Sequence, residues 1–233
     1  MEVSGISVIE DIMHGFNFEP LLRLLLSVVP ALICITLHEL SHGYVAYKLG
    51  DNTAKAQGRL TLNPLKHLDI MGLLMMVVCH VGWAKPVPVN MMNFRNPKRD
   101  MAITAIAGPV SNVLITAVFL FIYGLLFPFL AGSTAGGYIL LMIELTAQIS
   151  LGLGLFNLLP VPPLDGSKVL FSFLSNEAYY RLMRYERYGM IIMFVLVITG
   201  ILSGPLNWLI NTVYGWFLPI AQFACDLTVK IFL

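Results

Sequence analysis

The strongest constraint on the fold is a set of long apolar stretches separated by short polar segments. They cover residues 20–47, 101–130, 138–160, 188–203 and 206–229, and the fourth is the shortest. A membrane-spanning helix needs about 17 to 25 such residues, so each stretch is near or above that length. The mean hydropathy is +0.80, and only 12% of residues are charged, about half the share of a soluble domain. The sequence therefore predicts an all-α polytopic membrane protein.

A sixth apolar piece, residues 70–82, is too short for a full span and suits a re-entrant segment better. We therefore expect five to six transmembrane helices in one membrane-embedded domain, residues 1–233, with a short re-entrant or β-hairpin segment around 70–90. Gly82, Trp83, Pro86 and Pro88 interrupt this segment. Its edge could pair with an extended substrate through main-chain hydrogen bonds, and an ordinary surface turn is the competing interpretation.

The positive charges predict the orientation in the membrane. If residues 70–82 turn back, all of the 14 Lys and Arg residues except Arg23 fall on one side. Because cytoplasmic loops carry an excess of Lys and Arg, we expect the N-terminus outside and the C-terminus in the cytoplasm. A bacterial-type cytoplasmic membrane is the default location. The formal net charge of +1 gives no indication of nucleic-acid binding.

The first apolar stretch contains the motif His38-Glu39-Leu40-Ser41-His42. Histidines four residues apart share one face of a helix, so both imidazoles can bind a single metal ion, with Glu39 beside it as a candidate base. Lys48 follows His38 by ten residues, which places His38 about 15 Å from the cytoplasmic end of the helix. Ionisable groups at that depth normally face the bundle interior or a water-filled cavity. The motif therefore predicts a metal site inside the membrane.

A catalytic zinc ion needs a third protein ligand and an open position for water. The best candidate is Asp165, which follows Pro160, Pro162 and Pro163 at the end of a membrane helix. Prolines interrupt the helix, and lipid tolerates this only where protein or water satisfies the freed carbonyls, which indicates a cavity. Asp165 could instead cap a helix at the membrane surface, and Glu144 in the preceding span is the rival ligand.

The HELSH motif in one membrane helix and the segment NLLPVPPLDG, residues 157–166, in a later one resemble the site-2 protease family of intramembrane zinc metalloproteases. Residues 58–64, 82–90 and 107–112 also resemble family signatures. The resemblance implies one zinc ion per chain, bound by His38, His42 and Asp165, with Glu39 activating the attacking water. It also implies that Asn112 and Asn157 line the site. The chain is similar to the compact branch of the family, which has no PDZ or nucleotide-sensing domain.

The expected activity is hydrolysis of peptide bonds in or near transmembrane segments of membrane-tethered proteins. Glu39 would take a proton from the water and return it to the leaving amine, while Asn112 or Asn157 could donate a hydrogen bond to the oxyanion. A structural hydrogen bond between helices is the alternative role of each asparagine. The expected partners are a transmembrane protein substrate and the lipid bilayer, and a regulatory membrane partner is compatible with this activity.

Two other functional classes compete with the protease. A transporter that passes ions through His38, His42 and Asp165 leaves Glu39 unexplained, and the sequence lacks a second, inverted set of broken helices. A binding scaffold without activity would be favoured by a degraded metal-binding set, but all three residues are present. A membrane-embedded zinc metalloendopeptidase is therefore the predicted class.

Overall fold

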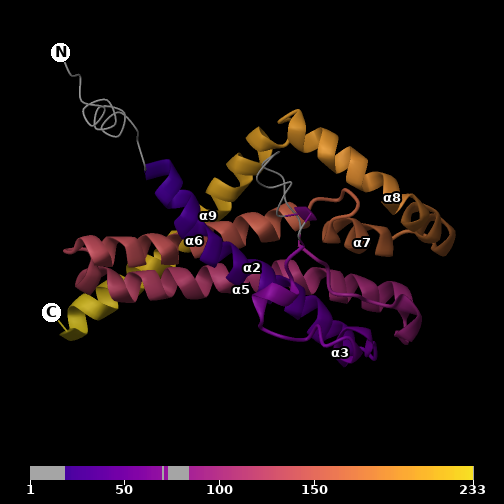
Figure 1. Cartoon of the computed structure of the whole chain (residues 1–233), viewed down its shortest axis with the longest axis horizontal. Helices are drawn as coiled ribbons and strands as arrows, with labels where there is room; N and C mark the ends of the chain where they lie inside the picture. The colour runs from indigo at the N-terminus through magenta and orange to yellow at the C-terminus, as the bar shows by residue number, and fades with distance from the viewer. Residues whose placement is uncertain (1–18, 70, 73–83, 233) are drawn as a thin grey trace, which may run out of the picture.

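The computed structural model describes residues 19–69, 71–72 and 84–232 of the 233-residue chain. Helices are the regular elements of these ranges, and they are arranged as shown in Figure 1. They are α2 (Glu19–Lys48), α3 (Thr53–Ala56), η1 (Pro64–Lys66), η2 (Met91–Asn93), α5 (Pro97–Leu130), α6 (Thr134–Asn157), α7 (Asp165–Ser172), α8 (Asn176–Ile198) and α9 (Ser203–Phe232).

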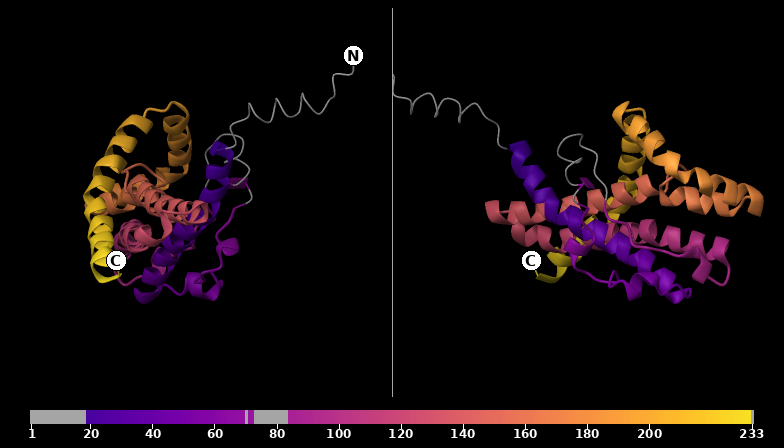
Figure 2. Two further views of the ribbon diagram at one scale, coloured as in Figure 1. Left: turned by 90° about the vertical axis from the view of Figure 1, so that its left-hand side faces the viewer. Right: turned by 45° about the vertical axis from the view of Figure 1, so that its right-hand side comes forward.

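Helix α5 is the centre of the bundle, because it contacts α2, α6, α7 and α9. Helices α5 and α6 lie side by side, and α2 crosses them obliquely (Figure 1). Helices α8 and α9 form a bent arm on the side of this pair opposite to α2 (Figure 2). The arrangement brings the second half of α2 and the first half of α5 together, and α7 closes the same region from a third side.

The two faces of α5 show the pattern of a helix in lipid. Residues at every fourth position, Thr104, Gly108, Asn112, Thr116, Leu120 and Gly124, are buried against neighbouring helices. The opposite face carries Val110, Leu114 and Val118, each about half exposed or more. Since lipid solvates apolar side chains, helices in membranes associate through small and hydrogen-bonding residues instead. The polar interior and apolar exterior of α5 follow this rule.

Side-chain hydroxyls join the central helices. The Ser150 hydroxyl of α6 donates to the carbonyl of Asn112 at 2.9 Å, and the Thr116 hydroxyl of α5 donates to the carbonyl of Ala147 at 3.1 Å. At the other end of α5, a Cβ atom on Gly124 would collide with the backbone of Ala221 in α9. These contacts hold α5 at a fixed depth relative to α6 and α9, and they therefore position the site residues that α5 carries.

Three helices are long and apolar enough to cross a membrane: Leu22–Lys48, Pro97–Leu130 and Thr134–Asn157. A fourth span is obtained only if Ile191–Ile198 and Ser203–Phe232, bent by 84° at the break between them, count as one. The polytopic all-helical class is confirmed for the described residues, but the predicted count of five to six spans is not. The separate spans predicted at 188–203 and 206–229 correspond to the end of α8 and to α9.

The break between α8 and α9 has a local cause. Gly200 adopts a positive φ of 69°, a conformation that ends helices and that residues with a Cβ rarely adopt. Helix α9 begins three residues later at Ser203, whose backbone N–H donates to the Gly200 carbonyl at 3.0 Å. The first half of α8 carries several charged residues. Only its last eight residues, Ile191–Ile198, therefore join Ser203–Phe232 in the candidate bent span.

The predicted hairpin segment around 70–90 lies largely outside the described residues, because residues 70 and 73–83 are not among them. Gly82 and Trp83 belong to this gap. In the described ranges no named strand is present, and one isolated antiparallel bridge pairs Leu68 with Ala84. The residues between Ala84 and η2 have no regular secondary structure. The hairpin itself stays a prediction.

Candidate metal centre

Helix α2 presents both histidines of the motif on its buried face. His38 is 4% exposed and His42 is 8% exposed. Their imidazole rings lie edge to face with centroids 4.6 Å apart, and the two Nε2 atoms are 3.0 Å apart. The four-residue spacing therefore places both rings one turn apart on the same side of the helix, as the sequence predicts.

Asp165 reaches the histidines from the other end of the chain. Its Oδ2 atom lies 3.2 Å from Nε2 of His38 and 3.0 Å from Nε2 of His42. Gly166 lets the chain pass close behind the carboxylate, since a Cβ atom there would lie 2.6 Å from the Leu159 carbonyl oxygen and still closer to that of Leu158. The proline-rich loop therefore holds the start of α7 against the end of α6.

A cation lies beside the Asp165 carboxylate, and a nearby opposite charge favours the ionised form of a carboxyl group. The Lys168 Nζ atom lies 3.9 Å from Oδ1 of Asp165, one turn along α7. A carboxylate must be deprotonated to bind a metal ion, so Asp165 is prepared for that role.

Helix α5 provides the surface against which both imidazoles pack. A Cβ atom at Gly108 would lie 2.6 Å from Cε1 of His38 and equally close to Cε1 of His42, so only glycine fits at this point of contact. One turn earlier, the Thr104 carbonyl oxygen lies 2.7 Å from Nδ1 of His42. With the proton of His42 on Nδ1, this carbonyl accepts it and leaves the Nε2 lone pair for a metal ion.

The three side chains fit a zinc ion. One ligand atom from each of His38, His42 and Asp165 lies within 4.8 Å of the others. The two imidazole nitrogens and the carboxylate oxygen are 3.0 to 3.2 Å apart, close to the edge of about 3.3 Å in a tetrahedron with zinc–ligand bonds of about 2.05 Å. Two neutral imidazoles and one carboxylate also match the ligand set of catalytic zinc sites, which keep a fourth position open. Glu144, the rival ligand, is not in this group and accepts a hydrogen bond from Gln148 at 3.0 Å.

The Glu39 carboxylate has a specific partner. Its Oε2 atom accepts a hydrogen bond of 2.8 Å from the backbone N–H of Val87, in the extended segment that follows Ala84. Pro86 and Pro88 flank Val87 in the sequence. The segment that we predicted as a substrate-pairing edge therefore contacts the candidate base within the chain itself.

The two asparagines differ in their surroundings. Asn112 is completely buried on α5, one turn beyond Gly108, and neither its Oδ1 nor its Nδ2 atom has a partner among the described residues. The Asn157 Nδ2 atom donates to the carbonyl of Leu153 in its own helix at 2.9 Å. A buried amide without a partner is costly and points to a ligand or a water molecule as its partner.

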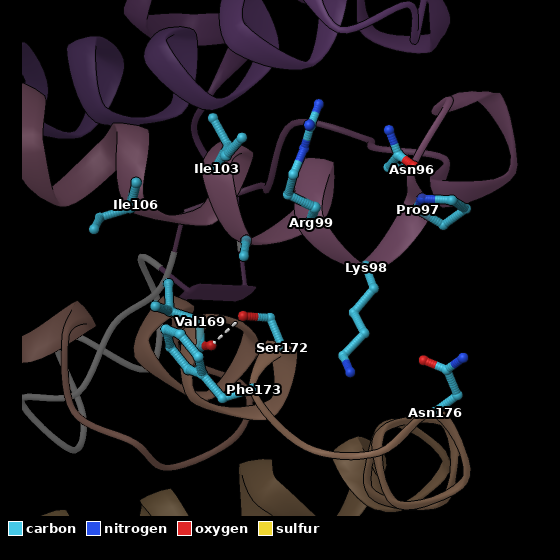
Figure 3. Close-up of a pocket in the computed structure, with 11 residues that line it drawn as sticks. Asn96, Pro97, Lys98, Arg99, Ile103, Ile106, Val169, Ser172, Phe173 and Asn176 are labelled. Atoms are coloured by element: carbon cyan, nitrogen blue, oxygen red, sulfur yellow. Dashed lines mark hydrogen bonds between the residues drawn. The ribbon is translucent and has the colours of Figure 1, made fainter.

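A separate cavity of about 670 Å³ opens between the first turns of α5 and helix α7 (Figure 3). Lys98 extends from α5 toward Asn176 at the start of α8 (Figure 3). Val169 on α7 and Phe173, just after α7, line the other side of the cavity. The metal-ligating residues are not among those that line this cavity. It is therefore distinct from the metal centre, which is packed tightly between α2, α5 and α7.

Sequence reasoning did not assign roles to three of these groups. Gly108, Thr104 and Val87 contact the site through pairings between residues distant in sequence. Gly108 and Val87 lie within the motifs that resemble family signatures, and this was the signal available. Their partners could be named only once the helices were placed.

Comparison with known proteins identifies the family. Residues 127–202, which include Asp165, match Peptidase family M50. The chain is also 39% identical over 203 residues to YwhC of Bacillus subtilis (strain 168), and the match covers 85% of this chain and 92% of YwhC. The chain belongs to peptidase family M50. This M50 chain is 30% identical over 191 residues to Rip2 of Mycolicibacterium smegmatis, covering 80% of this chain and 70% of Rip2.

Both relatives carry the name "Putative zinc metalloprotease". No solved structure matches the M50 chain. The predicted resemblance to site-2 proteases is confirmed, and so are the predicted class of enzyme, a zinc metalloprotease, and the predicted metal, zinc. Its long apolar helices are those of an integral membrane protein.

Proposed function

We propose that this M50 peptidase is an intramembrane zinc endopeptidase that hydrolyses peptide bonds in or near transmembrane segments of membrane-tethered proteins, the reaction of regulated intramembrane proteolysis. The observation that carries the proposal is the convergence of His38, His42 and Asp165 on one buried point beside Glu39. This point lies on a helix long and apolar enough to cross the membrane. The substrate bond must therefore be presented within or close to the bilayer.

His38, His42 and Asp165 would hold the zinc ion, and Glu39 would act as the base. Zinc bound there supplies Lewis acidity, which acidifies a water molecule and polarises the scissile carbonyl. Glu39 takes a proton from the attacking water with one carboxylate oxygen and later returns it to the leaving amine. Thr104 orients His42 through its carbonyl. Gly108 provides the space that both rings occupy.

Asn112 is the better candidate for the oxyanion donor. Its amide is buried, without a partner among the described residues, and one turn from Gly108, so it can donate to a substrate oxygen without giving up a hydrogen bond. The Asn157 amide already donates to the carbonyl of Leu153. We assign to Asn157 a structural role at the end of α6 before the proline-rich loop, although its hydrogen bond lies within α6 and does not join two helices.

Substrate helices protect their peptide bonds in intramolecular hydrogen bonds, so they must unwind locally before cleavage. We propose that residues 82–88, with Gly82, Trp83, Pro86 and Pro88, offer an extended edge with which an unwound substrate pairs. Support comes from the antiparallel bridge between Leu68 and Ala84 and from the contact of Val87 with Glu39. Residues 1–233 would act as one membrane-embedded domain.

The excess of Lys and Arg supports a cytoplasmic position for the end of the bundle that carries Lys48 and Lys98, with the N-terminus outside a bacterial-type cytoplasmic membrane. The predicted cytoplasmic C-terminus depended on five spans. Phe232 lies against Phe129, with ring centroids 6.1 Å apart, at the end of α5 remote from Lys98. A single bent span would therefore carry the C-terminus outside, and a C-terminal topology reporter decides between the two positions.

The decisive test compares purified wild-type protein with Glu39→Gln and His38→Ala, using a model transmembrane substrate and measuring bound zinc in each. We expect cleavage by the wild type alone. Glu39→Gln should keep about one zinc ion per chain, because the amide cannot accept a proton but no ligand is lost, whereas His38→Ala should lose the metal. Cleavage by Glu39→Gln at the wild-type rate would contradict the proposed role of Glu39.

A further inference from the structure

Residues 84–90 form a strap that crosses the Glu39 carboxylate and is anchored on both sides of it. On one side the Lys85 N–H donates to the His67 carbonyl at 2.9 Å. On the other side the Asn90 N–H donates to Oδ2 of Asp51 at 2.7 Å. Between these anchors lies the contact of the Val87 N–H with Glu39 at 2.8 Å. The strap is thus held independently of Glu39, and its central amide is positioned against the base.

The sequence of the strap leaves one donor at its centre. Pro86 and Pro88 have no backbone N–H, so Val87 provides the single amide proton between them. The Lys85 amide is already bonded to the His67 carbonyl. Proline also restricts its own φ and the conformation of the preceding residue, which keeps the strap extended. The Pro-Val-Pro sequence therefore presents a single N–H to Glu39 from a stiff backbone.

The Val87 side chain fixes the height of the strap above α2. Val87 is 7% exposed. A Cβ atom on Gly43 would lie 2.9 Å from Cγ1 of Val87, so the valine packs against α2 where Gly43 leaves room. Gly43 follows Glu39 by four residues and shares its helix face. The side chain and the amide of Val87 therefore contact successive turns of the same helix.

Arg59 holds the other end of the same peptide group. One guanidinium nitrogen donates to the carbonyl oxygen of Lys85 at 2.7 Å and to that of Pro86 at 3.2 Å. The Pro86 carbonyl and the Val87 N–H belong to one planar peptide unit, so their directions are coupled. The Pro86–Val87 peptide thus lies between a cation at its oxygen and the Glu39 carboxylate at its N–H. Hydrogen bonds in such a chain polarise and strengthen one another.

Among the described residues, an ion pair does not explain the burial of Arg59. Arg59 is 7% exposed, and in the described part of the chain no carboxylate forms an ion pair with it. A buried guanidinium is costly unless its donors are used. Here Nη2 donates to the two carbonyls that set the orientation of the Val87 amide, while Nε has no partner among the described residues.

We propose that Arg59 is a positioning residue, which acts through the Pro86–Val87 peptide to hold one oxygen of Glu39 and leave the other directed to the reacting water. The inference rests on the proposed role of Glu39 as the base. A flexible glutamate has three side-chain torsions, and proton transfer requires it within hydrogen-bond reach of the water. Restricting it before the substrate arrives should raise the rate of the chemical step without changing substrate binding.

The strap is also proposed to pair with substrate, and kinetics separate that role from the role of Arg59. A residue that acts in substrate pairing affects KM, whereas one that orients Glu39 affects kcat with zinc retained. The test uses the full-length protein and a model transmembrane substrate, with kcat, KM and zinc content measured for Arg59→Gln, Arg59→Lys and Lys66→Gln. Lys66→Gln is the matched control, since it removes one positive charge from an exposed side chain at the end of η1, outside the strap, without altering a backbone hydrogen bond.

We expect Arg59→Gln to lower kcat about 10- to 100-fold, the usual effect of losing a hydrogen bond to a charged group, with KM and zinc content unchanged. Arg59→Lys should recover most of the loss, because an ammonium restores the positive charge as well as the donors, whereas the glutamine amide is neutral. Lys66→Gln should match the wild type. A loss carried by KM, or a loss of zinc, overturns the proposal in favour of substrate pairing or a structural role.

A second variant decides the matter if Arg59→Gln does not fold. Replacing Val87 by its α-hydroxy acid converts one amide to an ester, which removes the N–H that donates to Glu39 and also weakens the Pro86 carbonyl as an acceptor for Arg59. The expected result is a fall in kcat of about 10-fold or more at unchanged KM. The same exchange at Val89, whose amide donates to no acceptor among the residues described, should be silent. Unchanged kcat with the Val87 ester refutes the proposal, whereas a wild type that binds zinc but cleaves nothing refutes the proposed function instead.

Discussion

Replacing Gly108 by alanine should remove the metal from an otherwise folded protein. The new Cβ atom would lie 2.6 Å from Cε1 of both His38 and His42, whereas ordinary van der Waals contact begins at 3.4 Å. The imidazoles must therefore move by about 0.8 Å, roughly four times the 0.2 Å tolerance of a metal–ligand distance. The Cε1 atom is bonded to the ligating Nε2 atom, so the displacement acts directly on the metal site.

The effect on folding should be limited. Alanine favours a helix over glycine by about 0.5 to 1 kcal/mol, and overpacking of a tight contact costs about 1 to 3 kcal/mol. The net loss of stability is thus at most about 2.5 kcal/mol. Zinc affinity should fall by at least about 100-fold, because both histidines are displaced, whereas loss of an outer-shell partner alone costs about 10- to 100-fold.

The assay is zinc content per chain after dialysis against a graded zinc buffer, together with the thermal unfolding temperature and substrate cleavage. Gly137→Ala is the matched control, since it makes the same change inside helix α6 where a Cβ atom meets nothing within 4 Å. We expect the control to bind zinc and cleave like the wild type. If Gly108→Ala binds zinc with wild-type affinity, the absence of a side chain at position 108 is not what positions the His38 and His42 rings.

Three further predictions address the oxyanion donor, the proline-rich loop and the strap. Asn112→Ala should lower kcat about 100- to 1000-fold. It should change the free energy of unfolding by less than about 1 kcal/mol, because the lost amide has no partner among the described residues. Asn157→Ala should lower kcat less, and equal effects of the two variants in kinetic assays would count against this assignment. Gly166→Ala should reduce both stability and zinc content, since its Cβ atom would meet the rigid Leu158 backbone; full zinc occupancy would show that the loop adapts. Burial opposes ionisation of Asp51, but hydrogen bonds from Thr53, Asn93 and the Asn90 amide hold the pKa of Asp51 below its ordinary value of 3.8. Its stabilising contribution should therefore be complete above pH 3.8 and be lost as the pH falls through the lower folded-state value, and Asp51→Asn should abolish that part of the pH dependence in unfolding measurements.

The three residues of the candidate metal site could be selected from the sequence because each lies in a local pattern with direct chemical meaning. The spacing of His38 and His42 specifies one helix face, and the prolines before Asp165 mark a broken helix that must border a cavity. The α8–α9 region was less predictable. Hydropathy registers the two apolar runs there but not the direction of the chain, which Gly200 changes through its positive φ.

Sequence alone also left the roles of the two asparagines open, since both lie in motifs that resemble family signatures. The two asparagines differ in the hydrogen-bond partners of their side-chain amides. Asn157 reaches a carbonyl in its own helix, while Asn112 faces the interior of the bundle without a partner among the described residues. Only packing of α5 against α2 and α6 creates that environment.

The chain by itself determined the class of the protein, because composition and helical spacing depend on residues close together in sequence. Apolar length predicts the membrane, and HELSH followed by a proline-bounded aspartate predicts a zinc protease. The contacts that prepare the site join residues far apart. Val87 donates to Glu39 across 48 positions and His42 contacts Thr104 across 62. Such pairings depend on how helices cross, a property of the whole packed bundle, and therefore only the tertiary structure decided them.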